Sequence, residues 1–450
     1  MTLCTIQPAS LENERLGLEF DEFGHLTSFV SKRTGHNYAG GDALWRLYLQ
    51  IGDELDIEVN TNESNVKPVI TYRDDCRLIF RWSSLTYMAR MGLVTQRRSL
   101  AIELEMEVSL PKVQNEDSDA VHWKIRLQNN EANVTIQETH FPLIKGLSLN
   151  GDQLLIWSRF GGEKISDIKA ELRTATTEYF APDHLFTSKT LNYPWPASTN
   201  CFTFAGEKES LYFGCHGDIG ERTLHQMRLH SNDTLEAGFV RFPHIACGES
   251  FQAGTYVTAI CHGDWHVAAR IYSCWARTWF RSVSKEGHPF EVPQWVRRMN
   301  GWQRVIMQHQ YGEAHYRFED MPTILSDGMM AGVDTLFMFG WHQGGHDNNY
   351  PEYVPEKKLG GLDAMVKGIR HFRENGGRVI LYSNGRLIDK NSQYYAEAGH
   401  HVCIKDVLGN EVRESYKFRG PGNYVYEHAN RTMLPACPSC EEWYAVLQEL

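Results

Sequence analysis

The sequence predicts a multidomain protein in which an antiparallel β-sandwich precedes an α/β region. Residues 1 to about 262 contain many short segments in which apolar and polar residues alternate, and few windows with helical spacing. From Trp295 onward, short continuous apolar runs alternate with amphipathic helical segments. The first pattern is typical of sheets that bury one face, and the second is typical of a parallel sheet covered by helices.

The first region has the two-residue period of a half-buried strand from its opening segments. Leu16, Leu18 and Phe20 alternate with Gly17 and Glu19. A turn at 21–24 then precedes a return strand at 26–30. Further short runs lie at 44–49, 77–82, 101–108, 121–127, 153–157, 201–205, 211–215 and 256–260. Many short strands with turn-rich separators predict a large antiparallel sandwich.

An amphipathic helix follows the sandwich. Asp264 can cap it, and apolar residues recur at helical spacing from Trp265 to Trp279. The polar segment 282–293 then contains one glycine and two prolines, so we expect a linker there. We therefore predict three parts, namely a sandwich over 1–262, a linking helix and linker over 263–294, and an α/β domain over 295–450.

The last part alternates strands with helices. We expect strands at 301–308, 335–339 and 378–382, and helices at 318–331, 361–374 and 439–450. Three parallel strands cannot close an eight-stranded barrel. The alternatives are a small open sheet or a barrel that is cut short in this polypeptide, and we favour the second.

Composition excludes several classes of function. Lys and Arg number 45 against 56 Asp and Glu, a net charge of −11, so nothing favours binding to nucleic acid or to an anionic membrane. The amino terminus lacks a signal peptide, and no apolar run reaches the length of a membrane span, so we expect a cytoplasmic protein. Phosphate-binding glycine motifs are absent and no cofactor is expected. The pair Cys437 and Cys440 is interpreted as structural thiols.

Candidate functional residues follow the three strands of the α/β region, because the carboxyl ends of parallel strands gather their loops at one edge. The first strand leads into Gln308–Tyr316, the second into Gly340–Pro351 and the third into Ser383–Asp389. Aromatic side chains there can stack on the apolar faces of sugar rings, while polar side chains can bind hydroxyls. We therefore predict a carbohydrate site.

Its residues are assigned by chemistry. Trp341 and Tyr350 are expected to stack on the sugar. The hydroxyl-binding candidates are His342, His346, Asp347, Asn384, Arg386 and Asp389.

A metal site is an alternative for the same loops. His342 and His346 are four residues apart, with Asp347, His309 and His315 as further possible ligands. Two glycines between the first pair argue against a shared helical turn, and no HExxH motif is present. We expect no metal, and a metal-dependent hydrolase stays open as an alternative.

A family resemblance adds to this interpretation. The segments 16–20, 34–35 and 44–47 resemble the galactose-mutarotase-like supersandwich that precedes the barrel in many glycoside hydrolases. The helix at 264–277 and the loops Gly340–His342 and Ser383–Arg386 look like those of incompletely characterised α-galactosidase-like barrel proteins. The resemblance implies an antiparallel β-supersandwich followed by a partial (β/α) TIM-type barrel.

The same resemblance implies an O-glycosyl hydrolase that acts on a non-reducing-end sugar of an oligosaccharide. Such enzymes use two carboxylates. In barrels of this type they follow later strands, so we expect them beyond residue 450. Within the chain, Asp347 and Asp389 are the catalytic candidates. A non-catalytic or degenerate carbohydrate-binding protein is the alternative. The sugar, anomer, linkage and oligomeric state are not predicted.

Two further features of the sandwich region were considered. A mutarotase-like catalytic set would make the protein an epimerase, but the candidates His140, His184 and His225 follow no recognisable spacing. The loop Tyr193–Pro196 is stiffened by two prolines and can cover a neighbouring site or pack at a domain interface.

Overall fold

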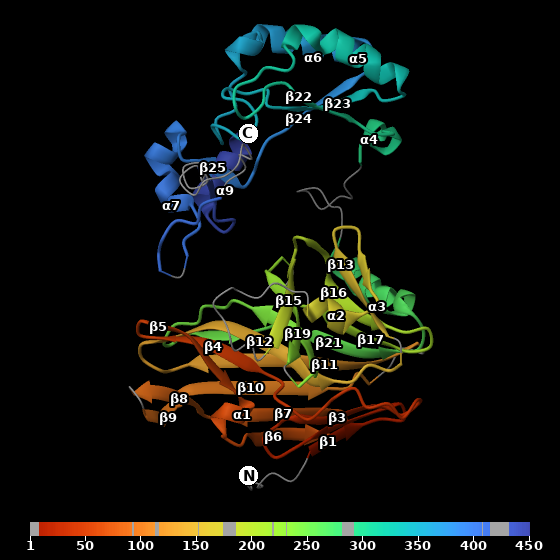
Figure 1. The fold of residues 1–450 in the computed structure, drawn as a ribbon, viewed down its shortest axis with the longest axis vertical. Coiled ribbons are helices and arrows are strands. Elements are labelled where there is room, and N and C mark those ends of the chain that lie inside the picture. Colours follow the sequence, from red (N-terminus) through yellow and green to blue (C-terminus); the bar gives the residue numbers. More distant parts are fainter. Residues whose placement is uncertain are drawn as a thin grey trace. The chain divides into compact units, whose positions relative to one another are not determined.

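The structure is a computed structural model that describes residues 9–91, 94–112, 117–151, 153–173, 186–217, 220–230, 232–280, 292–406, 408–414 and 432–450. Its contacts divide the chain into two compact units, Met1–Arg281 and Ser282–Leu450 (Figure 1). Most of the predicted linker, residues 281–291, lies outside the described residues, as does His184. The three-part division predicted from the sequence stays a prediction.

Unit 1 is built almost entirely of antiparallel sheets (Figure 1). Its strands are β1 (Ala9–Glu12), β2 (Leu16–Phe20), β3 (Leu26–Ser31), β4 (Arg46–Ile51), β5 (Glu54–Asn60), β6 (Val69–Asp74), β7 (Arg77–Trp82), β8 (Leu85–Met91), β9 (Val94–Leu100), β10 (Ile102–Ser109), β11 (Ser118–Asn129), β12 (Val134–Leu147), β13 (Leu154–Arg159), β14 (Glu163–Ile165), β15 (Phe186–Tyr193), β16 (Ala197–Ala205), β17 (Ser210–Cys215), β18 (Thr223–His230), β19 (Leu235–Arg241), β20 (Ser250–Gln252) and β21 (Tyr256–Cys261). Its helices are α1 (Thr61–Ser64), α2 (Ile168–Arg173) and α3 (Trp265–Trp279).

Two large sheets dominate this unit. The ten-stranded sheet has the order β14-β13-β16-β17-β21-β11-β10-β7-β6, with β20 paired to β11, and the six-stranded sheet has the order β15-β18-β19-β12-β4-β5. A three-stranded sheet, β1-β2-β3, and the hairpin β8-β9 complete the unit. The sequence prediction of a β-rich multidomain protein is confirmed.

Side-chain alternation explains why these segments pair into sheets. In β10, Ile102, Leu104, Met106 and Val108 are buried, and the residues between them lie on the more exposed face. Buried side chains from the sheets of unit 1 form one large apolar cluster. Removing that apolar surface from water stabilises the fold by roughly 25 cal/mol per Å².

Helix α3 begins where the sequence predicts. The Asp264 side chain accepts a hydrogen bond from the backbone N–H of His266 at 3.0 Å, which satisfies one free donor of the first turn. Val267 and Ala268 are buried in a small cluster with Tyr212 and Val257 of the ten-stranded sheet. The helix therefore belongs to unit 1 by its contacts.

Unit 2 contains a three-stranded parallel sheet, β22-β23-β24. Its elements are α4 (Gln294–Arg298), β22 (Gln303–Ile306), η1 (Phe318–Asp320), α5 (Met321–Met330), β23 (Thr335–Phe339), η2 (Lys357–Leu359), α6 (Gly361–Glu374), β24 (Arg378–Leu381), β25 (Leu387–Asp389), η3 (Tyr395–Gly399), α7 (His400–Val402), β26 (Met433–Pro435) and α9 (Glu441–Glu449). The predicted strands and helices at 301–382 are confirmed, with the first strand shorter than expected.

Helices α5 and α6 cover one face of this sheet (Figure 1). Leu336 and Met338 of β23 pack in a core with Met321, Leu325 and Phe372 of the helical layer. Because side chains alternate along a strand, Phe337 and Phe339 lie on the opposite face.

A TIM-type barrel is not shown by the described residues. After β24 the chain forms β25, which pairs antiparallel with β26, and no fourth parallel strand occurs in the described part. Only three residues form each of these strands, which is too short for a recognisable period in the sequence. None of the described helices has both the length and the apolar character needed to span a bilayer.

Candidate functional site

The predicted site lies at the carboxyl ends of the three parallel strands. We call the segments 308–316, 340–356 and 382–389 the rim. The parallel registers pair Ile306 with Phe339 and Met338 with Leu381, so the three strands end side by side. Their loops therefore start from one edge of the sheet, as expected for parallel α/β structure.

Hydrogen bonds then hold the three loops together. The backbone N–H of His346 donates to the Gln308 carbonyl oxygen at 3.0 Å, which joins the second loop to the first. The Trp341 indole N–H donates to the Tyr382 carbonyl oxygen at 2.9 Å, which joins the second loop to the third. The rim is thus one connected surface within unit 2.

A glycine makes the close approach of the first two loops possible. Gly340 has φ +59°, and a Cβ atom at this position would lie 2.1 Å from the Gln308 carbonyl oxygen. Only glycine combines a left-handed backbone with this contact at no steric cost. Further along the loop, Asp347 and Asn349 also have positive φ, and Asp and Asn are among the residue types that tolerate it.

The two aromatic residues predicted to stack on sugar lie below the rim surface. Trp341 is 6% exposed and belongs to the core beneath α5 and α6. Tyr350 is fully buried, and its hydroxyl donates to Asp347 Oδ1 at 3.2 Å. Burial raises the pKa of Tyr350, which keeps this donor protonated. Both residues support the loop from inside and offer no open ring face here.

A different aromatic group lies at the strand ends. The rings of Phe339 and Tyr382 are stacked at 4.3 Å, and the His346 ring lies 5.4 Å from the first and 5.5 Å from the second. Tyr382 and His346 are half-buried, so they reach the surface. The sequence analysis missed Phe339 and Tyr382 as site residues. Strand alternation would have indicated them, because both lie opposite the helix-facing positions.

The two predicted histidines are buried to different degrees. His342 is fully buried, its Nδ1 lies 3.3 Å from the Gln343 carbonyl oxygen, and burial lowers its pKa to about 4. The His346 Nε2 lies 3.5 Å from Asp347 Oδ2, and burial lowers its pKa as well. Both imidazoles are therefore neutral at neutral pH.

Three buried polar atoms of the rim have no hydrogen-bond partner among the described residues. They are Gln308 Oε1, His342 Nε2 and His346 Nδ1. An unsatisfied buried polar atom costs about 1–3 kcal/mol, and such atoms call for a partner such as a ligand or a bound water. The rim thus retains hydrogen-bonding capacity that its own fold does not use.

The two carboxylates named as catalytic candidates have different surroundings. Asp389 is 2% exposed and accepts backbone hydrogen bonds from Asn349 at 2.8 Å and from Asn391 at 3.0 Å. It holds the second and third loops together. The side chain of Asp347 is 13% exposed and reaches the surface beside His346. Of the two, only Asp347 has an open side.

The remaining predicted residues shape the third loop. The Asn384 Oδ1 accepts backbone hydrogen bonds from Arg386 and Leu387, both at 2.9 Å, and its Nδ2 donates to the Tyr382 hydroxyl at 3.2 Å. Arg386 is exposed and forms a two-point ion pair with Glu414. Asn384 therefore lies at the aromatic group, whereas the guanidinium of Arg386 is directed to Glu414.

Metal ligands were tested in the same region. Among the described residues, no three His, Cys, Asp or Glu side chains are arranged to hold an ion. The His309 and His315 rings lie 6.0 Å apart, and Glu313 Oε2 lies 3.6 Å from His309 Nδ1, but these described side chains are not arranged to hold an ion. The metal-dependent alternative has no observation in its favour.

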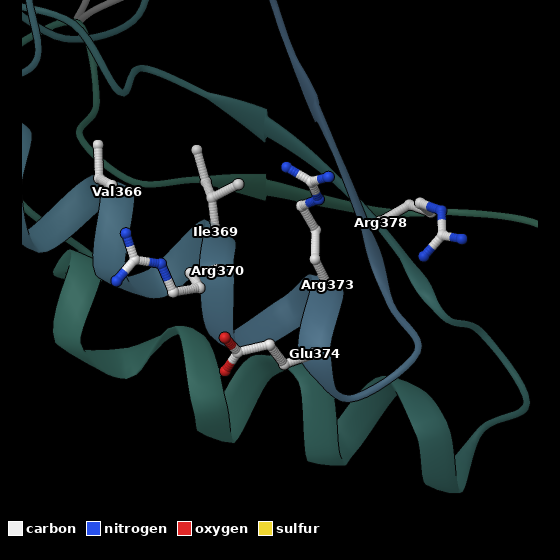
Figure 2. Close-up of a pocket in the computed structure, with 6 residues that line it drawn as sticks. All are labelled: Val366, Ile369, Arg370, Arg373, Glu374 and Arg378. Atoms are coloured by element: carbon white, nitrogen blue, oxygen red, sulfur yellow. The ribbon is translucent and has the colours of Figure 1, made fainter.

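Unit 2 also has a hollow of about 670 Å³ on α6 and β24, shown in Figure 2. Arg370, Arg373, Glu374 and Arg378 line it together with two apolar residues. Arg378 begins β24, so this hollow lies at the amino end of the strand, away from the rim. Its arginine side chains spread apart in Figure 2 instead of converging on one point.

Two of the histidines named for an epimerase, His140 and His225, are described by the structure, and they make separate contacts. His225 is buried in the core, where Nδ1 accepts from the Trp157 indole at 3.2 Å and burial lowers the pKa to about 3. His140 instead joins a group that we call the sandwich network. Its members are Arg46, Glu58, His140, Gln226, Arg228 and Glu236.

The sandwich network is a chain of buried ion pairs and hydrogen bonds on the six-stranded sheet. Arg46 binds Glu236 through two hydrogen bonds, at 3.0 and 2.8 Å, and Glu58 at 2.9 Å. With its amide oxygen facing Arg228, Gln226 accepts from that residue at 3.0 Å and donates to His140 Nδ1 at 2.9 Å. None of the network's buried polar atoms lacks a partner among the described residues.

Comparison with known proteins gives a fold likeness. A family profile described as "Domain of unknown function (DUF6259)" matches residues 252–450. No curated protein matches the sequence.

Among solved structures, the α-N-acetylgalactosaminidase NagBb from Bifidobacterium bifidum in complex with GalNAc is similar with a TM-score of 0.65 and 10% identity, over 99% of this chain and 66% of that one. Its complex with Gal-NHAc-DNJ gives a TM-score of 0.63 and 12% identity, over 95% of this chain and 64% of that one. The chain thus spans about two thirds of these structures. At such low identity the likeness establishes a glycoside-hydrolase-like fold.

Proposed function

We propose that this protein is a carbohydrate-active protein that binds a non-reducing-end sugar at the rim, with glycoside hydrolysis as its activity. The convergence of three loops at one edge of the parallel sheet, with Tyr382 and His346 at the surface, is the observation that carries the proposal. The glycoside-hydrolase-like fold supports it. The likeness also supports the proposal that unit 2 is part of a barrel.

The chemistry of the rim suits a polyhydroxyl ligand. The half-buried Tyr382 ring, which stacks on the buried Phe339, gives an aromatic surface, and the nearby Asp347 can accept hydrogen bonds from hydroxyls. The unpartnered nitrogen of His346 supplies a further polar contact. We propose these as the binding residues, with Asn384 orienting the Tyr382 hydroxyl.

The other predicted residues then have supporting roles. Trp341, His342, Tyr350 and Asp389 are buried and hold the second loop in place. Arg386 supports the third loop through its ion pair with Glu414.

A non-catalytic carbohydrate-binding protein is the second candidate, and one observation favours it. Glycosidases use two carboxylates placed on either side of the scissile bond. Besides Asp389, Glu352 accepts from the Tyr394 N–H, and Glu356 accepts from the N–H groups of Gly344 and Lys358. Asp389, Glu352 and Glu356 thus accept backbone hydrogen bonds that hold the loops, whereas the contacts of the Asp347 carboxylate in the described part of the chain are to the side chains of Tyr350 and His346.

The test separates binding from turnover. We would titrate the full chain with N-acetylgalactosamine and methyl α-galactoside by calorimetry, and assay release of p-nitrophenol from the corresponding aryl α-glycosides. Asp347→Asn and Tyr382→Ala should raise Kd at least tenfold, whereas Tyr72→Ala, an exposed tyrosine on β6, should not change it.

Binding without p-nitrophenol release would establish the non-catalytic candidate. Absence of binding to any sugar of the panel by the folded chain would overturn the proposal.

A further inference from the structure

A second cleft lies in unit 1 and is not part of the rim. It has a volume of about 900 Å³ and is lined by residues that include Asn150, Leu154, Ile156, Lys208, Glu209 and Trp265. We call it the Trp265 cleft. Its volume lies within the range of small-molecule sites, which is roughly 300–1,000 Å³.

Trp265 forms an exposed aromatic wall of this cleft. Its side chain is 43% exposed although it starts helix α3, whose next apolar residues are buried. The His266 ring stacks on the indole at 3.9 Å with an interplanar angle of 28°, and His266 Nδ1 lies 2.9 Å from Asp264 Oδ2. This contact backs one face of the indole and restrains it, so the aromatic wall is already in position before a ligand binds.

The floor of the cleft is apolar and its border is charged with both signs. Leu154 and Ile156 of β13 are half-buried on the floor. Lys164 and Lys208 line the cleft together with three acidic residues, Glu207, Glu209 and Asp264, which leaves an excess of one acidic side chain. This small acidic excess does not favour an anionic ligand. The border offers donors and acceptors on both sides of an apolar surface.

A buried carboxylate fixes the remaining wall. Glu209 is 5% exposed, and its side-chain oxygens accept from Ser31 at 2.7 Å, Tyr38 at 2.9 Å and Asn150 at 3.1 Å. These hydrogen bonds connect the three-stranded sheet β1-β2-β3, which contains Ser31, to the loops around the cleft. The wall that carries Asn150 is therefore rigid.

We propose that the Trp265 cleft is a second binding site in unit 1, and that its ligand is a neutral oligosaccharide. A sugar ring has an apolar face that fits the indole and the aliphatic floor, and hydroxyls that fit a border of mixed charge. The cleft does not require the rim to bind sugar, and it involves no covalent chemistry. Its role is to hold a glycan chain on the sandwich.

Affinity electrophoresis of the full chain tests the site. The probes are gels that contain galactomannan, xyloglucan or glycogen, which are neutral, and polygalacturonate, which is anionic. The intact protein should be retarded by at least one neutral polysaccharide. Trp265→Ala should weaken that retardation at least tenfold, whereas Trp295→Ala, another partly exposed tryptophan, should not.

Two further variants keep the result interpretable. Ile156→Arg places a long cation on the cleft floor and should also weaken retardation, and thermal melting would establish that both variants fold. Adding Trp265→Ala to a Tyr382→Ala background should still weaken retardation at least tenfold, which separates the cleft from the rim. Wild-type retardation of folded Trp265→Ala and Ile156→Arg, or retardation by polygalacturonate alone, would overturn the inference.

Discussion

The sandwich network and the rim both bury polar side chains, but only the first satisfies them internally. In the network, Arg46 and Arg228 approach Glu236, as does the neighbouring His230, and every buried polar atom of the network has a partner among the described residues. At the rim, Gln308, His342 and His346 each keep one unpartnered atom. Complete pairing indicates a structural role, whereas unsatisfied pairing at a loop edge indicates a place for a ligand.

The largest effect should come from breaking the network at Glu236. Burial alone would raise the pKa of this carboxyl, but hydrogen bonds from His230 and Arg46 hold it well below its usual range. Glu236→Ala leaves two buried guanidinium groups without their shared partner, which should lower the free energy of unfolding by about 3–5 kcal/mol. Urea unfolding of unit 1, followed by far-UV circular dichroism, measures this.

The matched control uses an exposed ion pair of the same unit. Glu103→Ala removes the pair with Arg81, in which both side chains are over a third exposed, and should cost about 0–1 kcal/mol. Equal losses in the two variants would contradict the structural role of the network.

The second largest effect should be a dependence of the free energy of unfolding on pH. His225 has a pKa near 3 in the folded protein because of burial, against about 6.5 when unfolded. Between these two pKa values the unfolded state binds a proton on His225 that the folded state does not. The contribution of His225 to the free energy of unfolding is therefore complete above pH 6.5 and decreases as the pH falls towards 3. The slope should be about 1.4 kcal/mol per pH unit.

Measurements between pH 7.5 and 5.0 avoid most of the titration of carboxylates. His225→Gln should reduce the slope in this window by about 1.4 kcal/mol per pH unit, and the remaining slope comes from other buried histidines such as His216 and His342, whose pKa values burial lowers to about 3 and about 4. A variant that keeps the wild-type slope would show that other groups carry it.

Gly340→Ala should have the next largest effect, and it acts on the rim. The added Cβ would meet the Gln308 carbonyl oxygen and would also hold alanine at positive φ, which we expect to cost about 1–3 kcal/mol and to weaken sugar binding. Gly312→Ala is the control, because Gly312 also has positive φ but nothing within 4 Å of the added atom. The difference between the variants measures the contact between the two loops.

The sequence predicted the sheet of unit 2 better than its site. Residues 335–339 form a continuous apolar run between helices with clear apolar stripes, and such patterns depend only on local spacing. The loops have no period. After the turn at Gly340 the chain folds back, so Trp341 lies in the core and its indole N–H donates a hydrogen bond to the Tyr382 carbonyl oxygen. That reversal depends on contacts between segments far apart in the sequence, which spacing does not encode.

The candidate site residues that the sequence analysis missed also show that local spacing does not predict which side chains reach the surface. Phe339 and Tyr382 were counted as strand residues because they end apolar runs. Their position at the rim, with Phe339 buried and Tyr382 half-buried, follows from the face of the sheet that they occupy. The sequence thus located the loops, and the structure assigns inner and outer positions within them.

The smallest effect gives the sharpest contrast between the two regions. His342→Leu removes a fully buried imidazole whose Nε2 has no partner among the described residues. It should therefore leave the free energy of unfolding within about 1 kcal/mol of wild type, because a lost desolvation penalty offsets the lost contact to Gln343. His140→Leu, which leaves Gln226 and Glu138 without their partner, should cost about 1–3 kcal/mol. A large loss for His342→Leu together with unchanged sugar binding would make the rim a structural network like that of the sandwich, since its imidazole would then be needed for folding alone.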